Sequence, residues 1–145
     1  MKKLLGYVGV DSGQVIITDP CYLKGFVNDD MKDIRVYKLI STGKDFQFGK
    51  DFLTYEEMIY KGKTMNQLIA DKEVIDLSDK YHKVFDYSYN GACNRTIYDK
   101  RGGGEIGLGE QGVVSRTGWG DGNYPVYAHY DKETGRISKL EIEFM

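Results

Sequence analysis

Short apolar and β-branched runs dominate the first twenty residues of the chain. Leu4–Val10 and Gln14–Thr18 are two such runs, and Asp11-Ser12-Gly13 lies between them. A short Asp/Gly turn between two strand-like runs is typical of a tight hairpin. Asp19-Pro20 ends the second run, because proline has no N–H to donate to a strand ladder.

The last twenty residues show the clearest alternation of apolar and polar positions. Tyr124–Tyr130 and Ile137–Phe144 flank the turn-forming segment Asp131–Arg136, which predicts a closing hairpin. In its second strand, apolar residues alternate strictly with charged ones. A period of two predicts one strand face on the core and the other in water.

Further short strands are predicted in the middle of the chain. Turn-forming residues separate them, including Asn90-Gly91-Ala92-Cys93. The predicted strands are Ile34–Ser41, Val84–Tyr89, Arg95–Tyr98, Glu105–Leu108 and Gln111–Ser115.

Helical signals are confined to the stretch between Leu53 and Glu73. Thr54 with Glu57 has the spacing of a capping box, and so does Thr64 with Gln67. The sequence therefore predicts one or two short helices near residues 54–73. With the strands, this gives a mainly β (α+β) fold, built as an antiparallel sheet or a rolled barrel.

Length and composition set the outer limits. The 145 residues fit one domain spanning 1–145, and 41% hydrophobic content is enough for a core. A net charge of −2 argues against non-specific binding of nucleic acid or of an anionic membrane surface. No run approaches the 18 apolar residues of a membrane span. The short apolar start reads as a strand rather than a signal peptide, so a cytoplasmic location is expected.

Glycine is unusually concentrated in one part of the chain. Nine of its 18 glycines fall between Gly102 and Gly122. Such a stretch forms turns, or backbone that another group approaches closely. Trp119, the one tryptophan, lies between two of these glycines, and it either fills the interior or lines a pocket.

Metal and covalent chemistry have weak support. Asp11, Asp19 and Asp121 are carboxylates at turns, and together they suit a hard cation. No EF-hand loop or zinc-ligand spacing accompanies them. Cys21 and Cys93 show no nucleophile motif with a histidine, so no catalytic residue, metal ligand or cofactor is predicted.

Ligand binding has more support. Lys100-Arg101-Gly102-Gly103-Gly104 places two cations before three glycines, whose backbone N–H groups are suited to an anion nest. The alternative is a solvated glycine loop. Arginine together with aromatic faces suits a ligand that carries both phosphate and a ring. The predicted ligand-binding residues are Asp11, Ser12, Asp19, Tyr89, Asn90, Arg101, Gly103, Arg116, Trp119, Asp121 and Tyr124.

Two motifs resemble those of a bacterial and phage family whose domain has no known function. The first is S-G-x-h-x-x-x-D-P, matched by Ser12 through Pro20, and the second is G-W-G-D-G-x-Y-P, matched by Gly118 through Pro125. A middle motif is matched by Gly91-Ala92-Cys93. The resemblance implies a β-rich fold whose motif turns meet at one end. Longer members carry more chain between the first and middle motifs, so residues 24–83 inherit nothing from it.

The leading hypothesis is a non-enzymatic protein that binds a small anionic ligand such as a nucleotide. In a phage setting, such a protein sequesters a host immune signal in the host cytoplasm. One alternative is a metal-dependent hydrolase that uses Asp11, Asp19 and Asp121. Another is a protein-interaction module that inhibits a host protein. The aromatic strands also allow a homo-oligomer.

Overall fold

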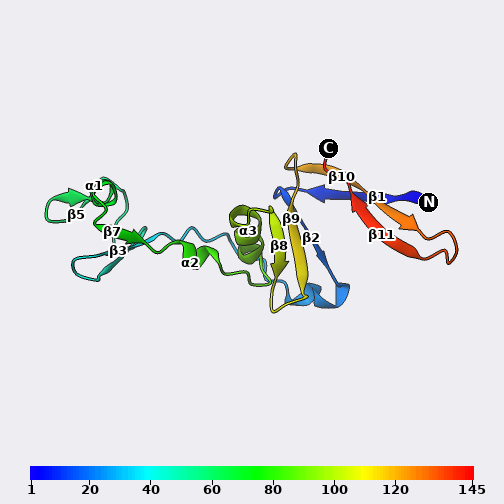
Figure 1. The fold of residues 1–145 in the computed structure, drawn as a ribbon, viewed down its shortest axis with the longest axis horizontal. Coiled ribbons are helices and arrows are strands. Elements are labelled where there is room, and N and C mark those ends of the chain that lie inside the picture. Colours follow the sequence, from blue (N-terminus) through cyan, green and yellow to red (C-terminus); the bar gives the residue numbers. More distant parts are fainter. The chain divides into compact units, whose positions relative to one another are not determined.

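The computed structural model describes residues 1–145 and divides into two compact units (Figure 1). The terminal unit comprises Met1–Asn28 and Phe85–Met145, and the inserted unit comprises Asp29–Val84. The fold is mainly β, with four antiparallel sheets and a few short helices, as the sequence predicts. The sheets are open, so the rolled-barrel alternative is wrong. That residues 1–145 form a single domain stays a prediction.

The terminal unit is built on a long ribbon of two antiparallel segments that bends once. Before the bend, β1 (Lys2–Val10) pairs with β10 (Gly122–Tyr130). After it, β2 (Gln14–Thr18) pairs with β9 (Gly112–Arg116). The predicted β1–β2 hairpin is therefore wrong. Asp11-Ser12-Gly13 does not fold one strand back on the other but passes the chain from one sheet to the next.

The bend, here called the corner, consists of residues 11–13 and 117–121. Gly13 donates its N–H to Asp121 Oδ1 at 2.8 Å, and its carbonyl oxygen accepts from Thr117 N at 2.9 Å. Gly13 and Gly120 both have positive φ, at 68° and 80°. Glycine adopts this left-handed backbone region without strain, which suits both residues to the bend. Tyr124 closes the corner by donating its hydroxyl to Gly120 O at 2.7 Å.

Beyond the corner, β8 (Gly103–Ile106) completes the helix-covered sheet β2-β9-β8. The helix α3 (Tyr89–Tyr98) lies against β8 and β9 (Figure 1). The buried residues between helix and sheet form a small core. They are Tyr87, Ala92, Ile106 and Val114, with Phe26 packed beside them. A 3-10 helix, η1 (Pro20–Gly25), follows β2, and Asp19 caps it by accepting from Cys21 N at 2.8 Å.

The helix α3 was not expected from the sequence. Strands over Val84–Tyr89 and Arg95–Tyr98 and a turn at Asn90–Cys93 were predicted there, and that prediction is wrong. Ser88 is the N-cap residue, and its hydroxyl accepts from Gly91 N at 3.0 Å. The helix places a buried stripe on the sheet, so tertiary burial outweighs the poor helix propensity of its residues.

On the other side of the corner, β11 (Ile137–Ile142) pairs with β10 to form the hairpin sheet β1-β10-β11 (Figure 1). The predicted closing hairpin is confirmed. Its apolar face is only partly buried, because Ala128 and Tyr124 of β10 are buried but the sheet belongs to neither hydrophobic cluster of the protein. Leu140 is 56% exposed on the apolar face.

The opposite, charged face of the hairpin sheet carries an ion-pair network. Glu141 contacts the amino groups of Lys2 at 2.7 Å and Lys139 at 3.0 Å, and the His129 ring at 3.1 Å. These hydrogen bonds lower the pKa of Glu141 to about 2. Glu141 is therefore ionised at neutral pH.

The inserted unit has its own sheet, β4-β3-β7, and its own core. The buried core residues are Tyr37, Leu39, Phe46, Phe52, Met65 and Leu68. Its elements are β3 (Val36–Leu39), β4 (Asp45–Gln47), β5 (Met58–Tyr60), β6 (Lys63–Thr64), α1 (Met65–Ala70), β7 (Val74–Asp76) and α2 (Asp79–His82).

One of the two predicted helices in this unit is confirmed. Thr64 caps α1 by accepting from Gln67 N at 3.2 Å, and Gln67 Oε1 accepts from Thr64 N at 2.8 Å. The helix predicted from Thr54 and Glu57 is wrong. The Glu57 carboxylate instead accepts from Leu53 N within a turn, and β5 follows. No helix of the protein is long and apolar enough to cross a membrane.

The corner predicts a specific loss of stability. Asp121→Ala removes the acceptor of Gly13 N–H, and we expect it to lower the free energy of unfolding by about 1 kcal/mol. Asp121→Asn keeps an oxygen acceptor and restores most of that loss. Thermal unfolding followed by circular dichroism measures both, with a shift of roughly 2–4 °C expected for Asp121→Ala.

The matched control is Asp11→Ala, because Asp11 lies in the same corner and its carboxylate accepts no hydrogen bond there. It should leave the melting temperature unchanged. Equal effects of Asp11→Ala and Asp121→Ala would show that the Asp121–Gly13 bond does not hold the corner.

Candidate functional site

Trp119 stands out on the surface of the corner. It lies in a turn closed by the hydrogen bond from Gly120 N to Thr117 O at 3.2 Å. Its side chain is 75% exposed, so the alternative in which it fills the interior is excluded. An exposed indole beside two glycines is a free stacking surface.

Three arginines gather on the face of the helix-covered sheet that α3 covers. A Cβ atom at Gly104 would lie 2.7 Å from Arg95 Nε and 2.9 Å from Arg101 Nη2. A Cβ atom at Gly102 would lie 2.8 Å from Arg116 Nε. The guanidinium groups therefore occupy the space that larger side chains would fill at Gly102 and Gly104. Gly102 and Gly104 are two residues apart and lie within about 7 Å of each other, so all three guanidinium groups line one short glycine run.

One carboxylate, Asp99, serves two of these arginines. Arg101 donates to it through Nε at 3.0 Å and Nη2 at 2.9 Å, and Arg95 Nη1 lies 3.6 Å away. The hydrogen bonds from Arg101 hold the pKa of Asp99 well below its usual range. Arg95 also stacks on the Phe85 ring at 3.9 Å and donates to Glu105 O at 2.8 Å, which fixes its position.

Arg116 forms no ion pair with any carboxylate, and its residue is exposed. Its backbone N–H donates to Gly102 O at 2.8 Å, which ties the end of β9 to the start of β8. Lys100 adds a further cation next to Arg101 in the sequence. We call Arg95, Arg101 and Arg116 the arginine cluster.

A cleft of about 200 Å³ opens on the same sheet face, between β2 and α3. Its lining is mostly apolar. The lining residues are Ser12, Gln14, Val15, Ile16, Phe26, Tyr89, Ala92 and Val114. Gln14 and Arg116 are directly paired across the two strands, so the cleft and the arginine cluster adjoin. Gln14 is fixed by hydrogen bonds to Cys93 Sγ and from Thr96 Oγ1.

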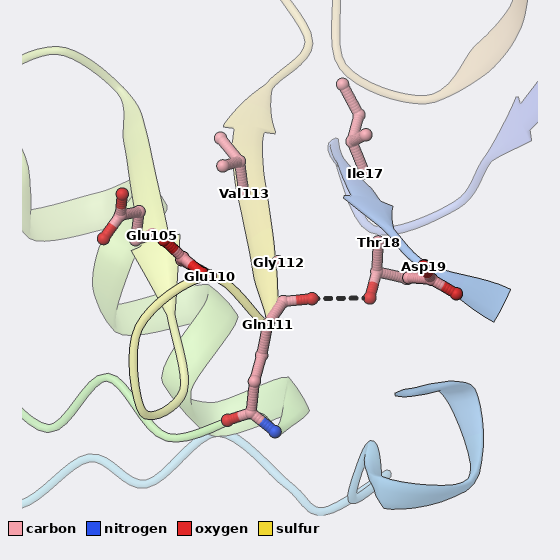
Figure 2. A pocket seen from close by; sticks show the side chains of 8 residues that line it. All are labelled: Ile17, Thr18, Asp19, Glu105, Glu110, Gln111, Gly112 and Val113. Atoms are coloured by element: carbon pink, nitrogen blue, oxygen red, sulfur yellow. Dashed lines mark hydrogen bonds between the residues drawn. The ribbon is translucent and has the colours of Figure 1, made fainter. Parts of the chain in front are cut away.

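A second cavity, of about 220 Å³, has the opposite character. Asp19, Glu105 and Glu110 line it, together with Ile17 and Val113 on the uncovered face of the sheet. Figure 2 shows Glu105 and Glu110 beside β8 and β9 and Asp19 across from them, where Thr18 donates to Gln111 O at 2.6 Å. Three carboxylates repel an anion, so this cavity does not suit the predicted ligand.

The predicted site residues fall into three groups. Most of them lie at the corner end of the helix-covered sheet or on the adjoining cleft. These are Asp11, Ser12, Tyr89, Arg101, Gly103, Arg116, Trp119, Asp121 and Tyr124. Asn90 is buried within α3. Asp19 lies at the opposite end of β2 and belongs to the acidic cavity.

Asp121 and Tyr124 have structural contacts, because both hold the corner through hydrogen bonds. Their predicted role in binding a ligand stays a prediction. The same holds for Asp19, whose carboxylate caps η1.

One N–H group of the predicted anion nest is engaged within the protein. The N–H of Gly102 donates to Asp99 O at 2.9 Å, and the neighbouring N–H of Arg101 donates to Asp99 Oδ1 at 2.9 Å. The space beside Gly102 and Gly104 holds arginine side chains. That the glycine run binds an anion stays a prediction.

The structure does not assemble a metal centre from the predicted carboxylates. Asp121 and Asp19 accept backbone N–H groups at opposite ends of β2. No group of three or more histidine, cysteine, aspartate or glutamate side chains is placed to hold a metal ion.

The sequence places Arg95 near a predicted turn, but the predicted ligand-binding residues include neither Arg95 nor the cleft residue Phe26. Arg95 was assigned to a strand, which hid its place in the last turn of α3. The spacing of Arg95 and Asp99, four residues apart, is a helical ion-pair signal that pointed to the helix.

Comparisons with protein-family models, with curated proteins and with solved structures find no match for this chain. The resemblance between its two motifs and the phage family therefore stays a prediction.

The Asp99 carboxylate predicts a pH dependence of stability. Its pKa in the folded protein is below the usual 3.8, so its ionisation stabilises the fold above that pH. The contribution is lost as the pH falls below 3.8 toward the lowered value. Asp99→Asn should thus destabilise the protein at pH 7, and the gap from wild type should shrink as the pH falls below 3.8.

Urea unfolding at a series of pH values measures this gap. Asp30→Asn is the control, because Asp30 is exposed and forms no ion pair. A gap for Asp99→Asn that stays constant over the whole pH range would contradict the assignment.

Proposed function

We propose that this protein binds a small anionic ligand with a ring, such as a nucleotide, without converting it chemically. The anionic part contacts the arginine cluster, and the ring enters the cleft between β2 and α3. The observation that carries this proposal is the packing of three guanidinium groups against a glycine run, with Asp99 as their one paired carboxylate.

The positive charge of the arginine cluster supports the binding of an anion there. Guanidinium groups bind phosphate through two parallel hydrogen bonds, and such charge-assisted bonds are among the strongest in proteins. Arg101 uses one edge of its guanidinium on Asp99, and Arg116 has no acidic partner. Asp99 balances only one of the three positive charges of the arginine cluster. An anion with two negative charges balances the other two.

The volume of the cleft suits the ring of a ligand rather than the whole ligand. Pockets that enclose a small molecule usually measure roughly 300–1,000 Å³, whereas this cleft measures about 200 Å³. It accommodates one apolar portion of a ligand and leaves the charged portion outside, on the arginines. Trp119 offers a further stacking surface near Arg116, within three residues of chain.

The resemblance to phage proteins extends this proposal to a biological role. A binder without catalysis lowers the free concentration of its ligand. Under this proposal the protein sequesters a nucleotide signal of the host, in the host cytoplasm.

The binding test uses titration calorimetry with ATP and with inorganic pyrophosphate, in the presence of EDTA. Arg116→Ala should weaken binding of both by about tenfold or more, because a charge-assisted hydrogen bond contributes roughly 1.5–3 kcal/mol. Arg136→Ala is the control, since Arg136 lies in the exposed β10–β11 turn. No binding of either compound, or equal effects of the two variants, would refute the arginine cluster as the site.

A second test distinguishes the contribution of the ligand's ring to binding from that of its negative charge. Ile16 lines the cleft and is 36% exposed, so Ile16→Trp can fill the cleft without entering the core. We expect this change to reduce the affinity for ATP to that for pyrophosphate and to leave pyrophosphate binding unchanged. Unaltered ATP binding in Ile16→Trp would show that the ring lies elsewhere.

A further inference from the structure

The hairpin sheet has two edge strands, and they differ in how well they are protected. The edge strand β1 begins with Lys2 and Lys3 and contains a bulge between Leu4 and Gly6. Charges, bulges and glycines are the usual devices that stop a strand edge from pairing with another chain. The edge strand β11 also has an irregularity, but at its start, between Ile137 and Lys139, and it is regular from Lys139 to Ile142.

The hydrogen-bond register shows which backbone groups of β11 point outward. Glu143 N donates to Pro125 O, its direct partner, so the next pair, Ile142 with Val126, is not hydrogen-bonded. The alternation continues, and Leu140 opposite Ala128 is again a non-bonded pair. The N–H and C=O groups of Leu140 and Ile142 therefore face away from β10, toward the open edge.

The side chains of β11 are complementary to a second copy of the same strand. In an antiparallel pairing centred on Leu140, each Leu140 opposes its counterpart, and Lys139 of each copy lies opposite Glu141 of the other. Opposite charges directly across two strands stabilise the pairing. The charged face is neutral as a set, since Lys2 and Lys139 balance Glu141 and Glu143.

A second copy of the chain would also cover exposed apolar residues of β11. On this face Ala128 and Tyr124 of β10 are buried, whereas Leu140 and Ile137 of the edge strand β11 are 56% and 53% exposed. The uncovered apolar area therefore lies at the β11 edge, where burial against another strand would contribute hydrophobic stabilisation. Pairing across β11 makes one six-stranded sheet, with the two Leu140 side chains side by side at its centre.

We propose that the protein forms a symmetric homodimer in which β11 of one copy pairs antiparallel with β11 of a second copy, centred on Leu140. This interface is independent of the arginine cluster. Since the paired strands are short, the interface is small, and we expect a weak, concentration-dependent dimer.

The test is a disulfide at the two-fold axis. Directly opposed residues of a hydrogen-bonded antiparallel pair have Cα atoms about 5.5 Å apart, within disulfide range. Leu140→Cys is placed in a Cys21→Ser background, because Cys21 is exposed and Cys93 is buried. On mild oxidation we expect a covalent dimer, measured on non-reducing gels.

The matched control is Ile137→Cys in the same background. Ile137 is equally exposed and lies on the same strand, but the two copies of residue 137 are about 20 Å apart in this pairing. It should give no covalent dimer on non-reducing gels. Equal cross-linking at both positions would indicate random collision and overturn the proposal.

Sedimentation velocity of the wild-type chain from about 5 to 500 µM gives a second readout. The weight-average mass should rise from 16.5 kDa toward twice that value. Leu140→Lys, which places two cations together at the axis, should weaken dimerisation by at least tenfold with an unchanged circular dichroism spectrum. A wild-type chain that stays monomeric throughout, or a Leu140→Lys variant that dimerises like wild type, overturns the proposal.

Discussion

The terminal unit depends on the hydrogen bonds between Gly13 and the segment from Thr117 to Asp121. Residues that are 108 positions apart meet there, and two β segments turn together from one sheet into the next. The bend uses left-handed backbone conformations, which explains the glycines with positive φ at the corner. On one side of the bend lies the hairpin sheet, and on the other lies the sheet that α3 covers.

The corner also changes the interpretation of the two sequence motifs. Serine, aspartate and glycine at such positions are compatible with a ligand site and with plain turn chemistry. In this fold, the carboxylate of Asp121 and the hydroxyl of Tyr124 are engaged with backbone groups of the corner itself. The features that point to a ligand lie beside the motifs, in a glycine run that accommodates arginines. The motif residues Asp121 and Tyr124 therefore have structural contacts, and the arginine cluster lies next to them.

Local patterns predicted most strands and the α1 cap, because these depend on residues close in sequence. Gln14–Thr18 and the closing hairpin are examples. The failures have a common cause, since each depended on a distant partner. Asp11-Ser12-Gly13 has the sequence of a hairpin turn, but β1 pairs with β10 and β2 pairs with β9, so β1 and β2 do not pair with each other. The α3 segment lacks helix formers and is helical because a sheet lies beneath it. Of the candidate site, Arg101 and Arg116 were predicted, whereas Arg95 depended on recognising α3.

The division of the chain into a discontinuous terminal unit and a continuous inserted unit has a consequence for its synthesis. On the ribosome, β1 and β2 emerge about 100 residues before the strands that pair with them. Their backbone groups have no native partner during that interval, whereas the inserted unit contains all of its own strands and can fold at once. Slow, non-local pairing of this kind leaves strand edges exposed to other chains. The two lysines and the bulge of β1 therefore act first during synthesis, when they hinder pairing of the unpartnered β1 strand with other chains, and only later in the folded protein.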